Sequence, residues 1–144
     1  MTRTELIFND KARVADWVAE RVGQLSPWGG YYAMGAERRG ELIAGVVFNN
    51  FTDTNATAHI AISKPAKRVI ELLDHAFIYA FHTCGLRRLT APVEETNAKS
   101  LKVCKHIGFE PEAVMAQAGT DGQDIHLLVL WPEKYMQGKQ HGQE

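Results

Sequence analysis

Residues 94–109 read EETNAKSLKVCKHIGF, and this stretch contains both ends of one helix. Asn97 is a residue type that caps helix N-termini, and Gly108 is a residue type that ends helices. The apolar positions at helical spacing between these two residues are Leu101, Cys104 and Ile107. They predict a helix that buries one face and follows a strand directly.

The segments around this helix alternate between strand and helix patterns. Strand patterns bounded by turn residues fall at residues 5–8, 31–37, 41–51, 56–63, 86–93, 109–117 and 124–131. Helical patterns fall at residues 11–22, 65–84 and 98–107. This order predicts an α/β chain with one mixed central sheet of about six or seven strands and helices on both faces.

Size and composition agree with a single globular domain. The chain has 144 residues, of which 45% are hydrophobic and 23% are charged, so two ordinary domains do not fit. We expect one domain over residues 1–135, followed by a polar tail over residues 136–144. The net charge of −1 argues against a general nucleic-acid binder. No apolar run approaches the roughly 18 residues that cross a bilayer, so no membrane partner is expected.

The expected compartment is the cytoplasm. The N-terminal segment turns polar by Asn9, so it does not resemble a signal peptide. Without export, Cys84 and Cys104 are expected to be reduced thiols. Cys104 and His106 stand two residues apart on the predicted helix and point to different sides, so no metal site is expected there.

The start of the helix at residues 65–84 carries an unusual set of charges. Lys64, Lys67 and Arg68 lie where the helix dipole is already positive, and this arrangement is unfavourable unless an anion neutralises it. Residues 64–106 as a whole contain eight basic and four acidic residues. The pattern indicates a phosphate or pyrophosphate site, with side chains that extend into water as the alternative.

The helix described first resembles a motif of the GNAT superfamily of N-acetyltransferases. The resemblance rests on Asn97, Ser100 and the pair Gly108-Phe109, and it extends over residues 42–131 in the family's order of elements. It looks closest to the branch that acetylates protein N-termini and similar amines.

The resemblance implies an acetyl-CoA site between two strands that splay apart, at residues 56–63 and 86–93. The pantetheine arm would pair with backbone at the end of the first strand, and the pyrophosphate would lie at the start of the following helix. Asn97 would contact the pantetheine arm or hold the splayed strand. The implied cofactor-binding residues are Ala61, Ile62, Ser63, Lys67, Arg68, Val69, Ile70, Asn97 and Ser100.

The sequence departs from the family's pyrophosphate loop, which usually reads Q/R-x-x-G-x-G/A. Pro65 falls at the Gln or Arg position, and Arg68 and Ile70 fall at the glycines. Glycines let backbone approach phosphates closely. We therefore expect the side chains of Lys67 and Arg68 to replace backbone contacts, with weak coenzyme binding as the alternative.

Two residues are candidates for proton transfer. Cys104 takes the place of the family's frequent tyrosine acid; it either donates a proton from its thiol or fills the inner face of the helix. His59 projects opposite to Ile60 and Ile62, toward the splay or solvent, and a neutral imidazole suits base chemistry. Glu94 and Glu95 are alternatives that act through water.

Aromatic residues near the first hairpin are candidates for the wall of an acceptor pocket. They are Trp28, Tyr31 and Tyr32, for which core packing is the alternative. Asn49, Asn50 and Phe51 end a strand near the same expected opening and are candidates for hydrogen bonds to a substrate.

These expectations favour transfer of an acetyl group from acetyl-CoA to a primary amine of a small molecule or peptide. Backbone N–H near Ile62 would stabilise the oxyanion. The alternatives are a non-catalytic acyl-CoA-binding or interaction module with the same fold, and an assembly protein that binds no coenzyme. A homodimer is among the assemblies that the sequence allows.

Overall fold

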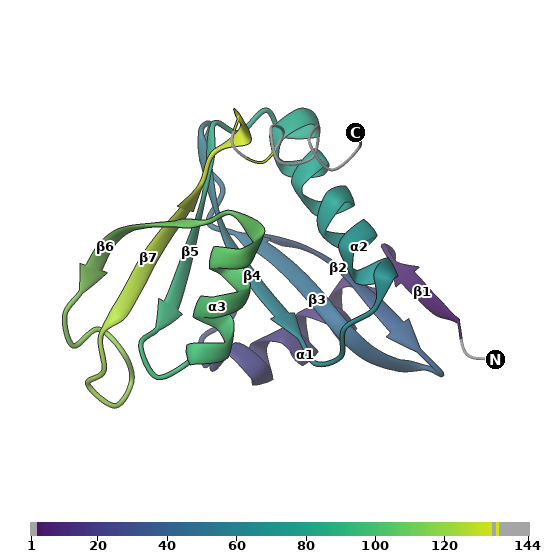
Figure 1. Cartoon of the computed structure of the whole chain (residues 1–144), viewed down its shortest axis with the longest axis horizontal. Coiled ribbons are helices and arrows are strands. Elements are labelled where there is room, and N and C mark those ends of the chain that lie inside the picture. The colour runs from purple at the N-terminus through teal and green to yellow at the C-terminus, as the bar shows by residue number, and fades with distance from the viewer. Residues whose placement is uncertain (1–2, 134, 136–144) are drawn as a thin grey trace.

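The computed structural model describes residues 3–133 and 135, and their strands form one seven-stranded sheet in the order β1-β2-β3-β4-β5-β7-β6 (Figure 1). The strands are β1 (Thr4–Ile7), β2 (Tyr31–Arg38), β3 (Glu41–Asn49), β4 (Asn55–Ile62), β5 (Arg88–Glu94), β6 (Glu110–Met115) and β7 (Ile125–Leu130). The helices are α1 (Lys11–Val22), α2 (Lys67–Ile78) and α3 (Ala98–Ile107), with a π-helical turn η1 (Tyr79–Thr83). The predicted tail at residues 136–144 lies outside the described residues.

The sheet is mixed, as predicted, because β4 and β5 pair in parallel whereas the other neighbours pair antiparallel. Its long hairpin between β2 and β3 turns at Arg39 and Gly40, which both adopt positive φ angles, of 56° and 76°. Two positive φ angles match the right-handed twist of hairpin strands. The tight turn expected there is therefore confirmed.

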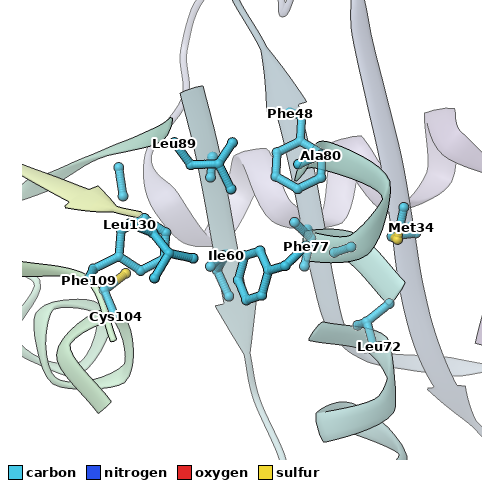
Figure 2. Close-up of a cluster of buried hydrophobic side chains, with 14 of the residues drawn as sticks. Met34, Phe48, Ile60, Leu72, Phe77, Ala80, Leu89, Cys104, Phe109 and Leu130 are labelled. Atoms are coloured by element: carbon cyan, nitrogen blue, oxygen red, sulfur yellow. The ribbon is translucent and has the colours of Figure 1, made fainter. Parts of the chain in front are cut away.

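Helices cover both faces of the sheet, which confirms the predicted layers (Figure 1). On one face, α1 packs on β2, β3 and β4 through a small core that includes Val14, Val18, Val47 and Ala61. On the other face, α2 and α3 cover a larger core, in which Figure 2 shows Phe48, Phe77, Leu89 and Phe109. No helix in the described part of the chain is long and apolar enough to cross a membrane.

Two facing glycines allow α1 to approach the sheet closely. Gly35 of β2 and Gly45 of β3 are direct partners in the antiparallel pair. A Cβ atom on Gly45 would lie 2.6 Å from Cγ2 of Val18 and 3.1 Å from Cγ1 of Val14. The short distance between α1 and the strands therefore requires a residue without a Cβ atom at position 45.

Replacing Gly45 with alanine is expected to lower the free energy of unfolding by about 1–3 kcal/mol, because α1 must shift to relieve the overlap with Val18. Denaturant unfolding measures the effect. Gly30→Ala is the matched control, since a Cβ there meets no atom within 4 Å. Equal stability of the two variants would contradict the close approach of α1.

The helix expected over residues 65–84 differs from the observed one at both ends. It begins at Lys67, and its last turn widens into η1, where Cys84 N–H donates to Tyr79 O. The wider turn places Tyr79 in a stacked contact with Tyr32 of β2, with 4.4 Å between ring centroids. The stop at Gly85 is confirmed, since this residue follows η1 with a φ of 68°.

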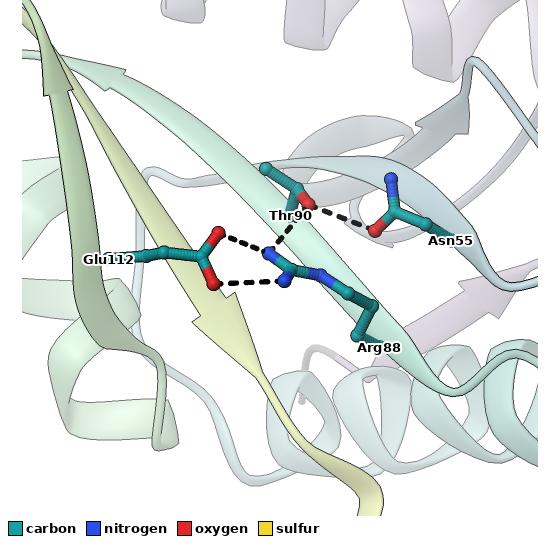
Figure 3. A network of polar contacts seen from close by, with 4 residues as sticks. All are labelled: Asn55, Arg88, Thr90 and Glu112. Atoms are coloured by element: carbon teal, nitrogen blue, oxygen red, sulfur yellow. Dashed lines mark hydrogen bonds and ion pairs between the residues drawn. The ribbon is translucent and has the colours of Figure 1, made fainter.

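The parallel pair of β4 and β5 is short. Three residue pairs form it, and the last joins Thr57 to Thr90. Side chains reinforce this closed end: Thr90 Oγ1 donates to Asn55 Oδ1 at 2.9 Å, and Arg88 donates to both carboxylate oxygens of Glu112 on β6 (Figure 3). Beyond Thr57 the two strands separate, which confirms the predicted splay.

Candidate active site

The separated part of β4 presents unpaired peptide groups to the opening. Ser63 N–H donates to Ile43 O at 2.7 Å, which fixes the direction of the peptide groups along β4. Because these directions alternate in an antiparallel pair, the N–H and C=O groups of Ile60 and Ile62 point away from β3. They face β5 after the pairing with β5 has ended. The opening therefore offers backbone donors and acceptors to a ligand.

Three neighbouring hollows follow this opening. The inner hollow, of about 360 Å³, lies between β4, β5 and α3. The middle hollow, of about 190 Å³, shares Ile60, Asn97 and Ser100 with it. The outer groove, of about 640 Å³, runs between α2 and α3 and shares Ile62 and Val103 with the middle hollow. The shared residues place the three hollows side by side, in a path from the sheet to the surface.

Charges divide along this path. Basic residues line the outer part: Arg21 and Lys99 in the middle hollow, and Lys67, Lys102 and His106 in the outer groove. Among the described residues that line these two hollows there is no Asp or Glu. The inner hollow has the opposite character, because its charged side chain is that of Glu94. An anionic ligand therefore fits the outer part, and a cationic ligand fits the inner end.

Glu94 is held in place from the turn between β6 and β7. Its Oε2 accepts a hydrogen bond from Gln123 Nε2 at 2.8 Å, and its side chain is half-buried at the end of β5. The carboxylate thus has a fixed position near the wall of the inner hollow.

His59 lines the inner hollow from the α1 side of the sheet. Its Nε2 lies 3.0 Å from Asn49 Oδ1, and the ring of Trp28 packs edge-on against the imidazole with 4.7 Å between centroids. Burial lowers the pKa of His59 to about 4, so the imidazole is neutral at pH 7. His59 therefore presents a neutral ring to the hollow; its role as a base stays a prediction.

The buried neutral His59 makes stability depend on pH. In the unfolded chain its pKa is near 6.5, so only the unfolded state gains a proton there as the pH falls from about 6.5 to about 4. Relative to His59→Gln, the wild-type protein is expected to lose about 3 kcal/mol of unfolding free energy across this window. Urea unfolding of both proteins at several pH values measures the difference, and parallel profiles would contradict the burial of a neutral ring.

Cys104 lies at the base of the inner hollow and is almost fully buried in the larger core. Burial raises the pKa of its thiol to about 11, and a hydrogen bond to Ser100 opposes this only in part. The thiol therefore keeps its proton at neutral pH. Its surroundings agree with the packing interpretation; the role as a proton donor stays a prediction.

Asn97 caps α3, as predicted, with its Oδ1 accepting a hydrogen bond from Ser100 N–H at 3.1 Å. The cap fixes the start of α3 beside the opening, and both residues line the inner and middle hollows. The sequence motif thus explains the position of α3 relative to the splayed strands.

Comparisons with known proteins agree with this architecture. No protein-family model and no curated protein matches the sequence. Spermidine/spermine N-acetyltransferase SpeG from Vibrio cholerae, solved with manganese ions, has a TM-score of 0.71 over 94% of this chain and 96% of its own, at 15% identity. Spermidine N-acetyltransferase from the same organism, solved with CoA and spermine, has a TM-score of 0.62 over 85% and 76%, at 17% identity. A probable acetyltransferase has a TM-score of 0.62 over 83% and 69%, at 20% identity.

This chain has the GNAT acetyltransferase fold. The fold prediction is therefore confirmed, and the splayed strands of the GNAT fold are β4 and β5. At these identities the likeness concerns the fold, so the residue assignments depend on the geometry of this chain.

Most of the residues predicted to bind the coenzyme lie along the path. Ala61, Ile62 and Ser63 line the middle hollow, and Lys67, Val69 and Ile70 line the outer groove. The N–H group of Val69 already donates to Ala66 O, so it is not free for a phosphate.

Arg68 differs from its neighbour Lys67. Its Nε lies 3.2 Å from Glu71 Oε2, one helical turn further on, and the side chain lines none of the three hollows. The two cations expected to act together are thus separated by the helix geometry, because consecutive residues on a helix point about 100° apart.

Other residues along the path were not assigned from the sequence. Lys99 and Lys102 lie three residues apart on α3, a spacing that places both on the face toward the path. Arg21 comes from α1, and no local pattern links it to this site. Of the aromatic candidates, Trp28 contacts His59, whereas Tyr32 stacks on Tyr79 instead.

Proposed function

We propose that this chain is an N-acetyltransferase that transfers an acetyl group from acetyl-CoA to a primary amine of a small molecule or peptide. The observation that carries the proposal is the division of charge along one path that begins at unpaired strand backbone. Acetyl-CoA has an anionic pyrophosphate end and a neutral thioester end, and an amine acceptor is cationic in water. The basic outer part and the acidic inner end match these two reactants.

In this proposal the coenzyme enters along the outer groove. Its phosphates lie near Lys67 and Lys102, and its pantetheine arm follows the unpaired peptide groups of Ile60 and Ile62. Asn97 and Ser100 border the arm at the start of α3. A GNAT-fold neighbour solved with CoA and spermine supports this class of ligand.

The acceptor enters as its ammonium ion and first loses one proton to solvent, because only the neutral amine has a lone pair. The neutral amine nitrogen then bonds to the thioester carbonyl carbon. As the C–N bond forms, the carbonyl oxygen becomes negative, and an N–H group of β4 near Ile62 stabilises it. The C–S bond then breaks, and the proton lost by the nitrogen ends on the CoA sulfur through water in the inner hollow. Holding both reactants in one hollow supplies much of the rate enhancement.

Glu94 is the residue proposed to select a cationic acceptor. Glu94→Gln is expected to raise KM for the amine about 3–10-fold with little change in kcat. The reason is that an ion pair between the half-buried Glu94 carboxylate and the ammonium group of the acceptor contributes about 1 kcal/mol or slightly more. Steady-state kinetics at saturating acetyl-CoA measure this. Glu95→Gln is the matched control, since Glu95 lies outside the lining of the inner hollow. An unchanged KM in Glu94→Gln would contradict the assignment.

Thermal unfolding with acetyl-CoA tests the proposed function, followed by thiol release on a panel of amines. Coenzyme at about 100 times its Kd is expected to stabilise the protein by about 2.7 kcal/mol, a rise in Tm of about 5–10 °C. Stabilisation together with amine-dependent CoA release supports the proposal. Stabilisation without turnover would favour the non-catalytic acyl-CoA-binding module, and no shift at millimolar coenzyme would favour the assembly protein.

The cytoplasmic location, the homodimer and the absence of nucleic-acid and membrane partners stay predictions of the sequence, as does the branch of acetyltransferases. GNAT-fold neighbours act on spermidine or spermine, according to their names. Polyamines therefore belong in the amine panel beside peptides with free N-termini.

A further inference from the structure

Asn49, at the end of β3, is one of two buried polar or charged side chains in the described part of the chain. Both polar atoms of its side chain are engaged. Its Nδ2 donates to the backbone oxygen of Trp28 at 3.2 Å, and its Oδ1 lies 3.0 Å from His59 Nε2. Asn49 therefore connects the α1–β2 loop to the imidazole on β4.

These two contacts determine where the proton of His59 lies. The backbone oxygen of Trp28 only accepts hydrogen bonds, so the amide nitrogen of Asn49 must face it. The amide oxygen then faces His59, and this oxygen also only accepts. His59 Nε2 must therefore carry the hydrogen, and a neutral imidazole has one N–H, so Nδ1 has a free lone pair.

The free nitrogen is accessible from the inner hollow. His59 Nδ1 forms no hydrogen bond with a described residue. It is also not one of the fully buried side-chain atoms without a partner, so part of its surface is accessible. The imidazole lines the inner hollow, and the edge-on ring of Trp28 limits its rotation. The titratable groups that line the same hollow are Glu94 and Cys104.

We propose that Asn49 is a positioning residue that holds His59 in the Nε2–H tautomer, so that Nδ1 accepts a hydrogen bond from the acceptor amine. The identity of the donor rests on the proposed function, whereas the tautomer does not. A hydrogen bond to Nδ1 directs the amine's lone pair toward the thioester carbon. His59 then acts by orienting the nucleophile, which needs a neutral ring at the pH of reaction.

Two substitutions at Asn49 separate this role from a structural one. Asn49→Asp and Asn49→Leu both remove the donor to Trp28 O, so they share the loss of that contact. Only Asn49→Asp keeps an oxygen that accepts from His59 Nε2. The carboxylate of Asn49→Asp also favours a charged imidazole, so both variants are compared at about pH 9, where the ring is neutral. A difference between them at this pH reports on the contact with His59.

The first readout is the ¹⁵N spectrum of the histidine side chains in the protein without substrate. In each tautomer one ring nitrogen carries a hydrogen and the other does not, so the two nitrogens give different signals. The signals of His59 are identified among the six histidines because they are missing from the spectrum of His59→Gln. At about pH 9, well above the ordinary imidazole pKa of about 6.5, wild type and Asn49→Asp are expected to show the Nε2–H tautomer. Asn49→Leu is expected to show a mixture or the Nδ1–H tautomer. An Nδ1–H tautomer in the wild type, or an unchanged tautomer in Asn49→Leu, would overturn the proposal.

The second readout is the kcat of the two variants. Asn49→Leu is expected to fall about 10–100-fold below Asn49→Asp, with KM for acetyl-CoA unchanged, because the amine loses its orienting contact. Equal kcat values would overturn the role in positioning. The spectrum is recorded without substrate, so it decides the tautomer even if no amine is acetylated. A failure of the proposed acetyl transfer is thereby distinguished from a failure of the proposed role of Asn49.

Discussion

Replacing Lys67 and Lys102 together with alanine is expected to weaken acetyl-CoA binding about 10–100-fold. The two lysines line the outer groove from opposite helices, α2 and α3, in a stretch of the path without acidic lining residues among those described. Each ammonium group removed costs a charge-assisted hydrogen bond to phosphate. Isothermal titration calorimetry with CoA measures the change in Kd.

The matched control is Arg68→Ala. Arg68 adjoins Lys67 in sequence and carries the same charge, but it pairs with Glu71 and does not line the groove. We expect a change in Kd of less than about 3-fold, from long-range charge alone. If Arg68→Ala weakened binding as much as the double substitution, the phosphates would lie elsewhere on α2.

Replacing Phe77 with alanine is expected to lower the free energy of unfolding by about 3–5 kcal/mol. Phe77 is fully buried on the inner face of α2, and its ring makes edge contacts with Phe109, at 6.3 Å between centroids, and with Tyr135, at 5.1 Å. Its removal leaves a cavity in the larger core, on the side of Phe109 (Figure 2). Urea unfolding followed by circular dichroism measures the loss.

Ile78→Ala serves as the control for this substitution. Ile78 is the next residue on α2, and 43% of its surface is exposed. We expect a loss of about 1 kcal/mol or less, because little apolar area is removed from the core. Similar losses in the two variants would mean that α2 does not bury the face that contains Phe77.

Local patterns predicted most of the fold because each element carries its own signals. Asn97 and Gly108 define α3, and alternation along residues 56–63 defines β4 within one residue at each end. Gly85 ends the helical segment before β5. Such signals depend on neighbours in the sequence, so the order of elements predicted the mixed sheet. The splay of its strands was expected only from the resemblance to the GNAT superfamily.

The site was less predictable, because its chemistry depends on tertiary contacts. The tautomer proposed for His59 rests on Asn49 and Trp28, which are distant from it in sequence, and the low pKa of His59 comes from its burial. Arg21 reaches the path from α1, and Arg68 is turned away by its place on α2. The spacing of residues in the sequence predicts neither the state of His59 nor the places of Arg21 and Arg68. It does predict that Asn97 caps α3.

The opening between β4 and β5 passes through the whole thickness of the sheet. His59 borders it from the layer of α1, and Cys104 borders it from the layer of α3. Elsewhere the paired strands keep the two hydrophobic cores apart. A bound ligand in this opening therefore acts as a cross-link between the layers, and the free energy of binding stabilises α1 and α3 together.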